Sequence, residues 1–308
     1  MTFSNIVKDE FLKTYYSAEC CSRAFLSAII HTAGTFNIEG RKIFIEINSR
    51  NIKLIERCRK EFFNKYRAEC VLKSSKYVYT LILDKEKSLE ILNDLYITEY
   101  DDNKSLQILP GINKYLAEEE CCNKAYLKGA FLGSGTIAIP NENASGYQLE
   151  FNVSNEIFAK DILELLSDFE LQGNYSARND GFVVYLKNSE TISDFLALLS
   201  ASKSVIHLQE LILKRQVSNL SNRQNNCYIA NAIKNFDASI VQVNSINIIE
   251  QNVGIESLNK GLRQAAKLRL ENPESSIEEL ALLADITKSG MNHRLRKINE
   301  IAEKFKID

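Results

Sequence analysis

Residues 19–26 read Glu-Cys-Cys-Ser-Arg-Ala-Phe-Leu, and residues 120–127 read Glu-Cys-Cys-Asn-Lys-Ala-Tyr-Leu. The two stretches lie 101 residues apart, the difference between Cys20 and Cys121. The similarity continues beyond these stretches: Gly34-Thr35 corresponds to Gly135-Thr136, and residues 77–81 correspond to residues 182–186. A repeat of about one hundred residues is far longer than a solenoid unit. We infer that the first two thirds of the chain contain a duplicated unit, arranged as a pseudo-twofold pair.

Size and charge set limits on the class of protein. The chain has 308 residues with 45% hydrophobic side chains, enough for two or three domains with ordinary cores. The net charge of −2 excludes a uniformly basic nucleic-acid-binding chain. Residues 216–308 hold 12 basic and 11 acidic side chains, and subtraction from the totals of 38 and 40 leaves 26 and 29 for the rest. A DNA-binding surface must therefore be a local face.

The N-terminus and the cysteines indicate a cytoplasmic protein. The first ten residues lack the basic and apolar regions of a signal peptide, and no apolar run is long enough to span a membrane. The seven cysteines form an odd set with adjacent pairs, which is a poor disulfide framework. We expect free thiols in a reducing compartment and no membrane association.

Periodicity predicts the same order of elements in both repeats. In the first repeat we expect a helix at 19–33, a strand at 42–47, a helix at 52–64, a hairpin at 70–72 and 78–83, and a helix at 89–95. In the second we expect 121–132, 147–153, 157–169, a hairpin near 175 and 182–186, and 192–199. Gly34 is expected to end the first helix in the left-handed conformation. The turn-forming run Pro140 to Gly146 is an insertion between elements.

From about residue 205 the pattern is helical only. Ser276 and Glu279 have capping-box spacing after Pro273, so a helix begins there and runs to about Ala284. A short connection at 285–287 leads to a last helix at roughly 288–304. Its apolar stripe, predicted to face the neighbouring helix, comprises Met291, Leu295, Ile298, Ala302 and Phe305.

The last helix also carries a basic face. Residues 288–297 contain four Lys or Arg side chains and no acid. A donor-rich face of this kind can reach base edges and phosphates in a major groove. The same pattern is equally compatible with a charged face that only contacts solvent, because paired helices are common in α domains.

The cysteine pairs and the histidines give little support for a metal or catalytic site. Structural zinc ligands are usually separated by two to four residues, and neighbours on a helix diverge by about 100°. We therefore interpret the paired cysteines as packing thiols and expect no metal and no cofactor. None of His31, His207 and His293 has a local triad context. His31, inside an apolar helix, is expected to be a core or interface histidine.

The repeated helix resembles a known motif. Residues 26–34, Leu-Ser-Ala-Ile-Ile-His-Thr-Ala-Gly, and 127–135, Leu-Lys-Gly-Ala-Phe-Leu-Gly-Ser-Gly, look like degenerate copies of the LAGLIDADG motif of homing endonucleases. Nearly the whole chain resembles the bacterial WhiA family, which joins such a domain to a C-terminal helix-turn-helix. Three further segments carry that resemblance: Asn222 to Lys234, with Asn226-Cys227 and Ala230-Asn231; Leu268 to Glu274; and Thr287 to Ile298.

The resemblance implies an α+β fold. Two LAGLIDADG-like repeats with pseudo-twofold αββαββα halves would be followed by an all-α domain containing the helix-turn-helix. The expected domains are residues 1–117 for the first repeat, 118–215 for the second and 216–308 for the helical domain. The helix-turn-helix would occupy about 275–308.

A departure from the motif decides the expectation about catalysis. In the nucleases that the motif resembles, an acid from each half holds divalent metals at the scissile phosphates. The corresponding positions here are Ala33 and Ser134. Neither replaces a carboxylate as ligand to a hard cation, so we expect no nuclease activity. We expect the motif helices to form a packing seam through small residues, namely Ala24, Ala28, Ala125, Gly129 and Gly133.

The resemblance further implies a non-catalytic, sequence-specific regulator of transcription that binds double-stranded DNA. Its roles would be in cell division and chromosome segregation, and in sporulation where the organism sporulates. We expect a cytoplasmic, nucleoid-associated monomer. Phosphate contacts are expected from Lys288, Arg294 and Lys297, and base-edge contacts from Ser289, Asn292, His293 and Arg296, with Thr287 beside them.

Two alternatives stay open at this point. One is a residual or altered nuclease, which nicking of plasmid DNA with magnesium or manganese would reveal. The other is an interaction hub, in which the duplicated domain binds a regulatory protein or a small effector. Specific retention of a partner by residues 1–215 would favour the hub.

Overall fold

The computed structural model describes residues 2–40, 42–103, 105–140 and 146–305. The chain forms two compact units, Met1–Leu213 and Lys214–Asp308, each with its own core. Residues 141–145 of the predicted insertion and 306–308 of the predicted helix-turn-helix segment lie outside the described residues. No helix in the described part of the chain is long and apolar enough to cross a membrane.

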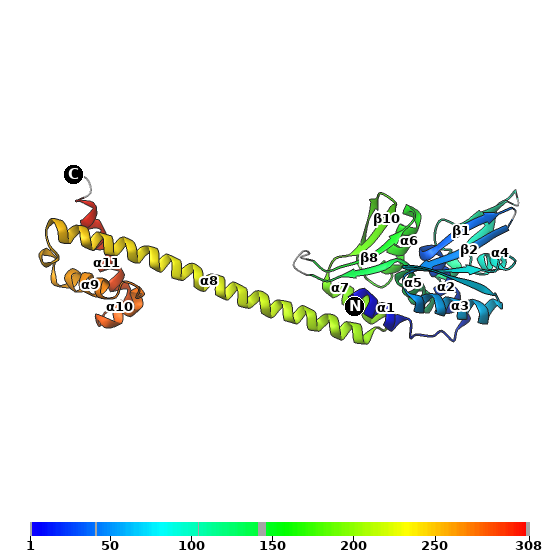
Figure 1. The fold of residues 1–308 in the computed structure, drawn as a ribbon, viewed down its shortest axis with the longest axis horizontal. Coiled ribbons are helices and arrows are strands. Elements are labelled where there is room, and N and C mark those ends of the chain that lie inside the picture. Colours follow the sequence, from blue (N-terminus) through cyan, green and yellow to red (C-terminus); the bar gives the residue numbers. More distant parts are fainter. Residues whose placement is uncertain (1, 41, 104, 141–145, 306–308) are drawn as a thin grey trace. The chain divides into compact units, whose positions relative to one another are not determined.

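The first unit contains two four-stranded antiparallel sheets in the same strand order, β1-β2-β4-β3 and β7-β8-β10-β9 (Figure 1). The first repeat comprises α2 (Glu19–Ala33), β1 (Gly34–Glu39), β2 (Lys42–Ser49), α3 (Ile52–Tyr66), β3 (Cys70–Ser75), β4 (Val78–Leu83) and α4 (Ser88–Asp94). The second comprises α5 (Glu120–Ser134), β7 (Gly135–Ala138), β8 (Gln148–Val153), α6 (Glu156–Ser167), β9 (Asn174–Arg178), β10 (Gly181–Leu186) and α7 (Ser189–Leu198). Each repeat is an αββαββα half, which confirms the predicted fold class.

The two halves meet along α2 and α5, which pack against each other (Figure 1). A Cβ atom on Gly129 would lie 2.5 Å from the carbonyl oxygen of Phe25 and 2.9 Å from Cβ of Ala28. A Cβ atom on Gly133 would lie 1.9 Å from Oγ1 of Thr32. The helix backbones therefore approach closely because these positions lack side chains. The predicted packing seam is confirmed.

Gly34 is required for a different reason from the one predicted, and Gly135 occupies the equivalent place in the second repeat. Neither is left-handed: Gly34 has φ −86° and ψ 146°, and Gly135 has φ −71° and ψ 144°, so each passes directly from its helix into an extended strand. A Cβ atom on Gly34 would lie 2.4 Å from the carbonyl oxygen of Ile30. The prediction of a left-handed helix end is wrong, because the sharp helix-to-strand turn needs space rather than positive φ.

Periodicity missed several short elements. They are α1 (Phe3–Phe11), the first strand of each sheet (β1 and β7), the hairpin β5 (Thr98–Tyr100) and β6 (Leu106–Ile108), and η1 (Lys114–Leu116). Helix α1 lies against β7, where the Ser4 hydroxyl donates to the Ile137 carbonyl (3.0 Å) and accepts from the Ile137 amide (2.8 Å). Its Glu10 carboxylate accepts from the amides of Lys203 and Ser204, at 3.0 and 2.9 Å. Glu10 thereby caps the start of α8 (Ser202–Asn252).

The second unit is helical, as predicted. After α8 come η2 (Ile255–Ser257), α9 (Lys260–Glu271), α10 (Ile277–Leu283) and α11 (Lys288–Glu303). Gly254, with φ 78°, allows the chain to turn sharply after α8. A core of aliphatic residues from α8, α9, α10 and α11 holds the unit together. Residues 222–234, which carry part of the family resemblance, are exposed on α8.

Candidate nucleic-acid interface

Two well-capped helices, α10 and α11, form the C-terminal part of the second unit. Ser276 and Glu279 make the predicted capping box at the start of α10. Asp285 adopts the left-handed conformation (φ 49°) in the connecting turn, and the Thr287 hydroxyl accepts from the Gly290 amide (3.1 Å) at the start of α11. This turn fixes the direction in which α11 leaves α10.

One face of α11 is held against the rest of the unit. Met291, Leu295, Ile298 and Ala302 are fully buried, and Phe305, just beyond the helix, is half-buried. They contact α9 and α10 through the second core. The predicted apolar stripe is therefore confirmed for the four helical positions. Burial of this stripe fixes which side chains of α11 face outward.

The outward face of α11 is rich in hydrogen-bond donors. The exposed residues are Thr287, Lys288, Ser289, Asn292, His293, Arg296 and Lys297. Lys288 pairs with Glu278 (2.8 Å) and Lys297 with Glu300 (3.0 Å), but all four side chains are mostly exposed. Such pairs contribute little and can exchange for phosphate oxygens. Arg296 donates no hydrogen bond to any described residue.

Arg294 differs from the other predicted contacts. It is half-buried, and its Nη1 donates to the Gly261 carbonyl (3.3 Å) and to Oε1 of Gln264 (3.2 Å), both on α9. Its guanidinium thus joins α11 to α9 and lies away from the exposed residues of α11. A helical wheel does not distinguish this position from a solvent-facing one, because the neighbouring helix decides it.

Arg269 supports the interface and was not singled out from the sequence. It is only 2% exposed, and its Nη1 donates to the carbonyls of Asn272 (3.4 Å), Pro273 (3.3 Å) and Ser275 (2.6 Å). The Ser239 hydroxyl on α8 also donates to the Pro273 carbonyl. A buried cation with several carbonyl acceptors orders the turn that leads into α10. The signal in the sequence was the resemblance of residues 268–274.

The motif positions Ala33 and Ser134 lie at the C-terminal ends of α2 and α5. The Thr32 hydroxyl donates to the Ala28 carbonyl (2.7 Å), and the Ser134 hydroxyl to the Ala130 carbonyl (3.5 Å). An open pocket beside Ser134 has Asp9 as the one carboxylate among its described lining residues, and Asp9 accepts from Lys53 (2.7 Å). Lys8 lines the same pocket, and burial lowers the pKa of its ammonium group to about 8. This cationic lining offers no pair of carboxylates for two metal ions.

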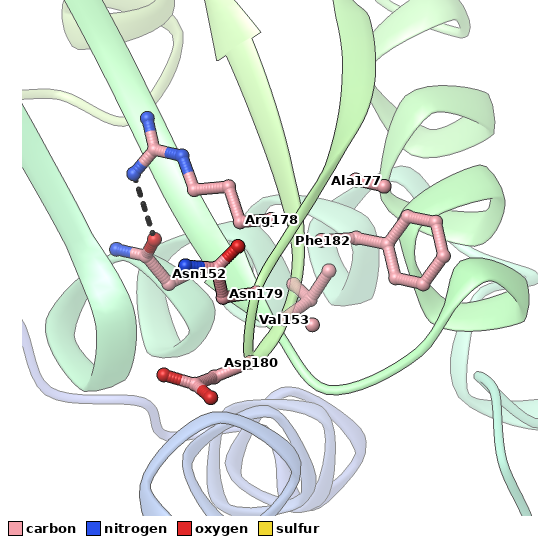
Figure 2. A pocket seen from close by; sticks show the side chains of 8 residues that line it. Asn152, Val153, Ala177, Arg178, Asn179, Asp180 and Phe182 are labelled. Carbon is pink, nitrogen blue, oxygen red and sulfur yellow. Dashed lines mark hydrogen bonds between the residues drawn. The ribbon is translucent and has the colours of Figure 1, made fainter.

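A second pocket lies at the turn between β9 and β10 (Figure 2). Arg178 points across it toward Asn152, and its guanidinium donates to Oδ1 of Asn152 (3.5 Å) and to Glu150 (2.6 Å). Asp180 adds a second carboxylate nearby. Because two carboxylates, Glu150 and Asp180, lie around this single arginine, the local negative charge makes the pocket a poor site for a phosphate.

His31 packs where the two repeats meet, as predicted. Its Nδ1 lies 2.7 Å from Oη of Tyr126, and its ring packs at a tilt of 40° against the ring of Phe158, with the ring centroids 5.2 Å apart. Nε2 is buried and has no hydrogen-bond partner among the described residues. Burial lowers the pKa of the imidazole to about 4, so the ring is neutral at physiological pH.

The protein should lose stability on acidification through His31. A folded-state pKa of about 4 lies below the unfolded value of 6.5, so the unfolded state binds the proton first. The stabilisation is complete above pH 6.5 and is lost as the pH falls toward 4. Between pH 7 and pH 5 the free energy of unfolding should fall by about 2 kcal/mol from this group. Urea titrations of wild type and His31→Gln would measure it, and an equal loss in the variant would exclude His31 as the cause.

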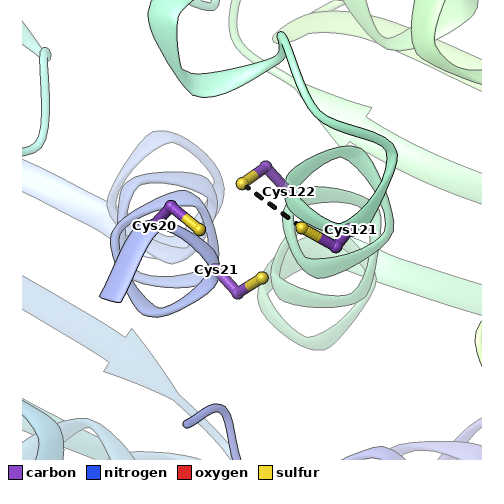
Figure 3. Close-up of side chains that lie close together, drawn as sticks. All are labelled: Cys20, Cys21, Cys121 and Cys122. Carbon is purple, nitrogen blue, oxygen red and sulfur yellow. Dashed lines mark hydrogen bonds between the residues drawn. The ribbon is translucent and has the colours of Figure 1, made fainter. Parts of the chain in front are cut away.

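The adjacent cysteine pairs do converge, contrary to the prediction. The Sγ atoms of Cys20, Cys21, Cys121 and Cys122 all lie within 4.8 Å of one another, and Figure 3 shows them turned toward one another from the ends of α2 and α5. Neighbouring side chains diverge around a single helix, but this divergence does not keep the sulfurs of two helices apart. Two helix ends that meet about a pseudo-twofold axis can direct both members of each pair into the space between them.

The chain matches two family models, one for each unit. The model described as the WhiA C-terminal HTH domain matches residues 221–302. The model described as the WhiA LAGLIDADG-like domain matches residues 22–98 and 123–218. The chain belongs to the WhiA family. This result confirms the resemblance seen in the sequence.

This chain is similar to other WhiA proteins, and to one solved WhiA structure, over almost its whole length. Proteins named "Probable cell division protein WhiA" from Brevibacillus brevis and Alkaliphilus metalliredigens are 34% and 33% identical, and each alignment covers 99% of this chain and 98% of the relative. The crystal structure of full-length DUF199/WhiA from Thermatoga maritima has a TM-score of 0.58 at 23% identity and covers 99% of both chains. The helix-turn-helix of this WhiA member makes it a DNA-binding protein.

Proposed function

We propose that this protein is a non-catalytic, sequence-specific DNA-binding regulator of transcription that acts in cell division. The observation that supports the proposal is the exposed, donor-rich face of α11. The opposite face of this capped helix is buried in the core of the second unit, so the orientation of the exposed side chains is fixed. Membership of a family whose relatives are named for cell division supports the cellular role. Roles in chromosome segregation, and in sporulation where the organism sporulates, are part of the same proposal.

The exposed residues divide by chemistry. Lys288 and Lys297 would contact phosphates, which position the protein on the duplex. Ser289, Asn292, His293 and Arg296 would face base edges, with Thr287 at the helix start. Arg296 is the strongest base-reading residue in this set, since a guanidinium can donate two hydrogen bonds to guanine. Arg294 would act through its contact with α9, which holds α11 in place.

The duplicated domain would be a scaffold without nuclease activity. Ala33 and Ser134 stand where a two-metal nuclease needs acids, and the neighbouring pocket is lined by Lys8, Arg50 and Lys53. We propose residues 1–117 and 118–215 as its two repeats and 216–308 as the helical DNA-binding domain. The protein would act as a cytoplasmic, nucleoid-associated monomer, and its scaffold could present a surface to a regulatory protein or a small effector.

One incubation tests both parts of the proposal. Fragmented genomic DNA is mixed with the full-length protein and magnesium or manganese, bound fragments are separated on a native gel, and their strands are then resolved under denaturing conditions. We expect a reproducible subset of fragments to be retained at moderate salt, with every strand intact. Retention in proportion to fragment length alone would contradict sequence specificity. Nicks that scale with protein, and that a separately purified batch reproduces, would contradict the absence of catalysis.

A further inference from the structure

Four thiols from two distant parts of the chain meet at the N-terminal end of the seam. Cys20 and Cys21 lie in the first turn of α2, and Cys121 and Cys122 in the first turn of α5. In the part of the chain that the structure describes, they are the one group of three or more metal-ligating side chains close enough to share an ion. We propose that these four cysteines bind a single zinc ion that joins the two repeats.

The distances fit one tetrahedral ion. Zinc–thiolate bonds of about 2.3 Å place the four sulfurs of a tetrahedral site about 3.8 Å apart. The observed separations are all within 4.8 Å, and Sγ of Cys121 lies 4.0 Å from Sγ of Cys122. Small side-chain rotations close the difference, because the sulfurs already face a common centre (Figure 3). An iron–sulfur cluster would hold its cysteines farther apart, since bridging sulfides lie between the irons.

The surroundings favour a thiolate-bound cation over packing thiols. Four thiolates around one divalent ion carry a net charge of −2, and the partial positive charge of about half an elementary charge at each helix start stabilises that net charge. Cys21 and Cys122 are buried, whereas Cys20 and Cys121 are exposed, so one side of the group is shielded and the other is open to an arriving ion.

The neighbouring acids are engaged elsewhere. Glu19 pairs with Arg23 (3.2 Å) and Lys65 (2.6 Å), and Glu120 pairs with Lys124 (2.5 Å). Among the described residues, no carboxylate oxygen is close enough to these sulfurs to belong to the same group, so the ligand set is all sulfur. Such a set selects zinc over magnesium or calcium, which prefer oxygen.

Disulfide bonds fit the arrangement less well. Adjacent Cα atoms are about 3.8 Å apart, below the range of about 4.4 to 6.8 Å that disulfides span, so neither pair can bond internally within a regular helix. One bond between the helices would leave two of the four thiols without a partner, and only a second such bond would engage them all; in this structure all four cysteines are free. A single ion engages all four, and it would link the two repeats of the scaffold directly.

Metal analysis of the full-length protein tests the site. Wild type is expressed with added zinc, purified without chelators under nitrogen, and analysed by mass spectrometry for metals. We expect one zinc per chain in wild type and in the control Cys227→Ser, which changes an exposed cysteine outside the group. The variant Cys20→Ser with Cys121→Ser should lose at least tenfold in zinc content, while circular dichroism shows whether it remains folded.

Cobalt provides a readout that needs no variant. Stripped wild-type protein titrated with cobalt should develop thiolate-to-cobalt charge-transfer bands and the visible bands of a tetrahedral site, saturating at one equivalent. Three results would overturn the proposal: wild type without zinc and without these bands, zinc retained equally by the double variant, or a disulfide between the helices found after thiols are blocked at the moment of lysis.

Discussion

Replacing Arg296 and Lys297 together by alanine should abolish binding to promoter fragments without unfolding the protein. Both side chains are exposed on α11, and Arg296 donates no hydrogen bond within the described chain, so neither supports the fold. A base-reading arginine contributes about 1–3 kcal/mol, and a phosphate contact adds a salt-dependent part. Together we expect the Kd to rise roughly 100-fold or more, which removes the gel shift at protein concentrations that saturate wild type.

A second double variant distinguishes the effect of where the two cations lie from the effect of losing their charge. Lys260→Ala with Lys267→Ala removes the same charge from exposed sites on α9, and it should change the Kd only slightly. The slope of log Kd against log salt should become shallower by about one for the α11 variant, because one phosphate contact is lost. Unchanged gel shifts at moderate salt would refute the assignment of α11 as the reading helix. Equal losses in both variants would show that only net charge matters.

Gly129→Val should destabilise the first unit more than any surface change. Its Cβ atom would lie 2.5 Å from the Phe25 carbonyl oxygen and 2.9 Å from Cβ of Ala28, and both are fixed in the opposing helix. The helices must then separate along the whole seam, since neither backbone can yield locally. We expect a loss of about 3 kcal/mol, which lowers Tm by about 6–12 °C in a domain of this size.

Gly146→Ala is the control for Gly129→Val, because an added Cβ atom there meets no described residue within 4 Å. Calorimetry of the full-length protein should show the first unit melting earlier in Gly129→Val and unchanged in Gly146→Ala. If the Tm of Gly129→Val stayed within about 2 °C of the wild-type Tm, well below the expected decrease, α2 and α5 would not be in close contact.

Much of the fold could be predicted from the sequence because its signals are local. The duplication, the hydrophobic periodicity of α3 and β8, and the capping box at Ser276 all depend on residues near one another in the chain. Membership of the family was equally visible in short segments, and the comparisons confirm it. The absence of acids at Ala33 and Ser134 could likewise be read directly from the sequence, because it depends only on which residue occupies each motif position.

The sequence could predict the DNA-contacting residues only to the extent that their positions around a single helix decide which side chains face outward. Periodicity separated the buried stripe, which the structure confirms at Met291, from the outward face. It could not place Arg294 against α9, because that contact depends on a helix about thirty residues away. Nor could it reveal that Arg269 orders the turn before α10.

The paired cysteines show the difference between what the sequence determines and what only the tertiary structure determines. Sequence alone established that each repeat begins with the same Glu-Cys-Cys and that the two copies build one pseudo-twofold domain. Tertiary structure alone decided that the four sulfurs meet, because their separation depends on how closely α2 and α5 approach. That approach is set by Gly129 and Gly133, a few turns farther along α5, where the absent side chains allow the backbone of α5 to lie close to α2.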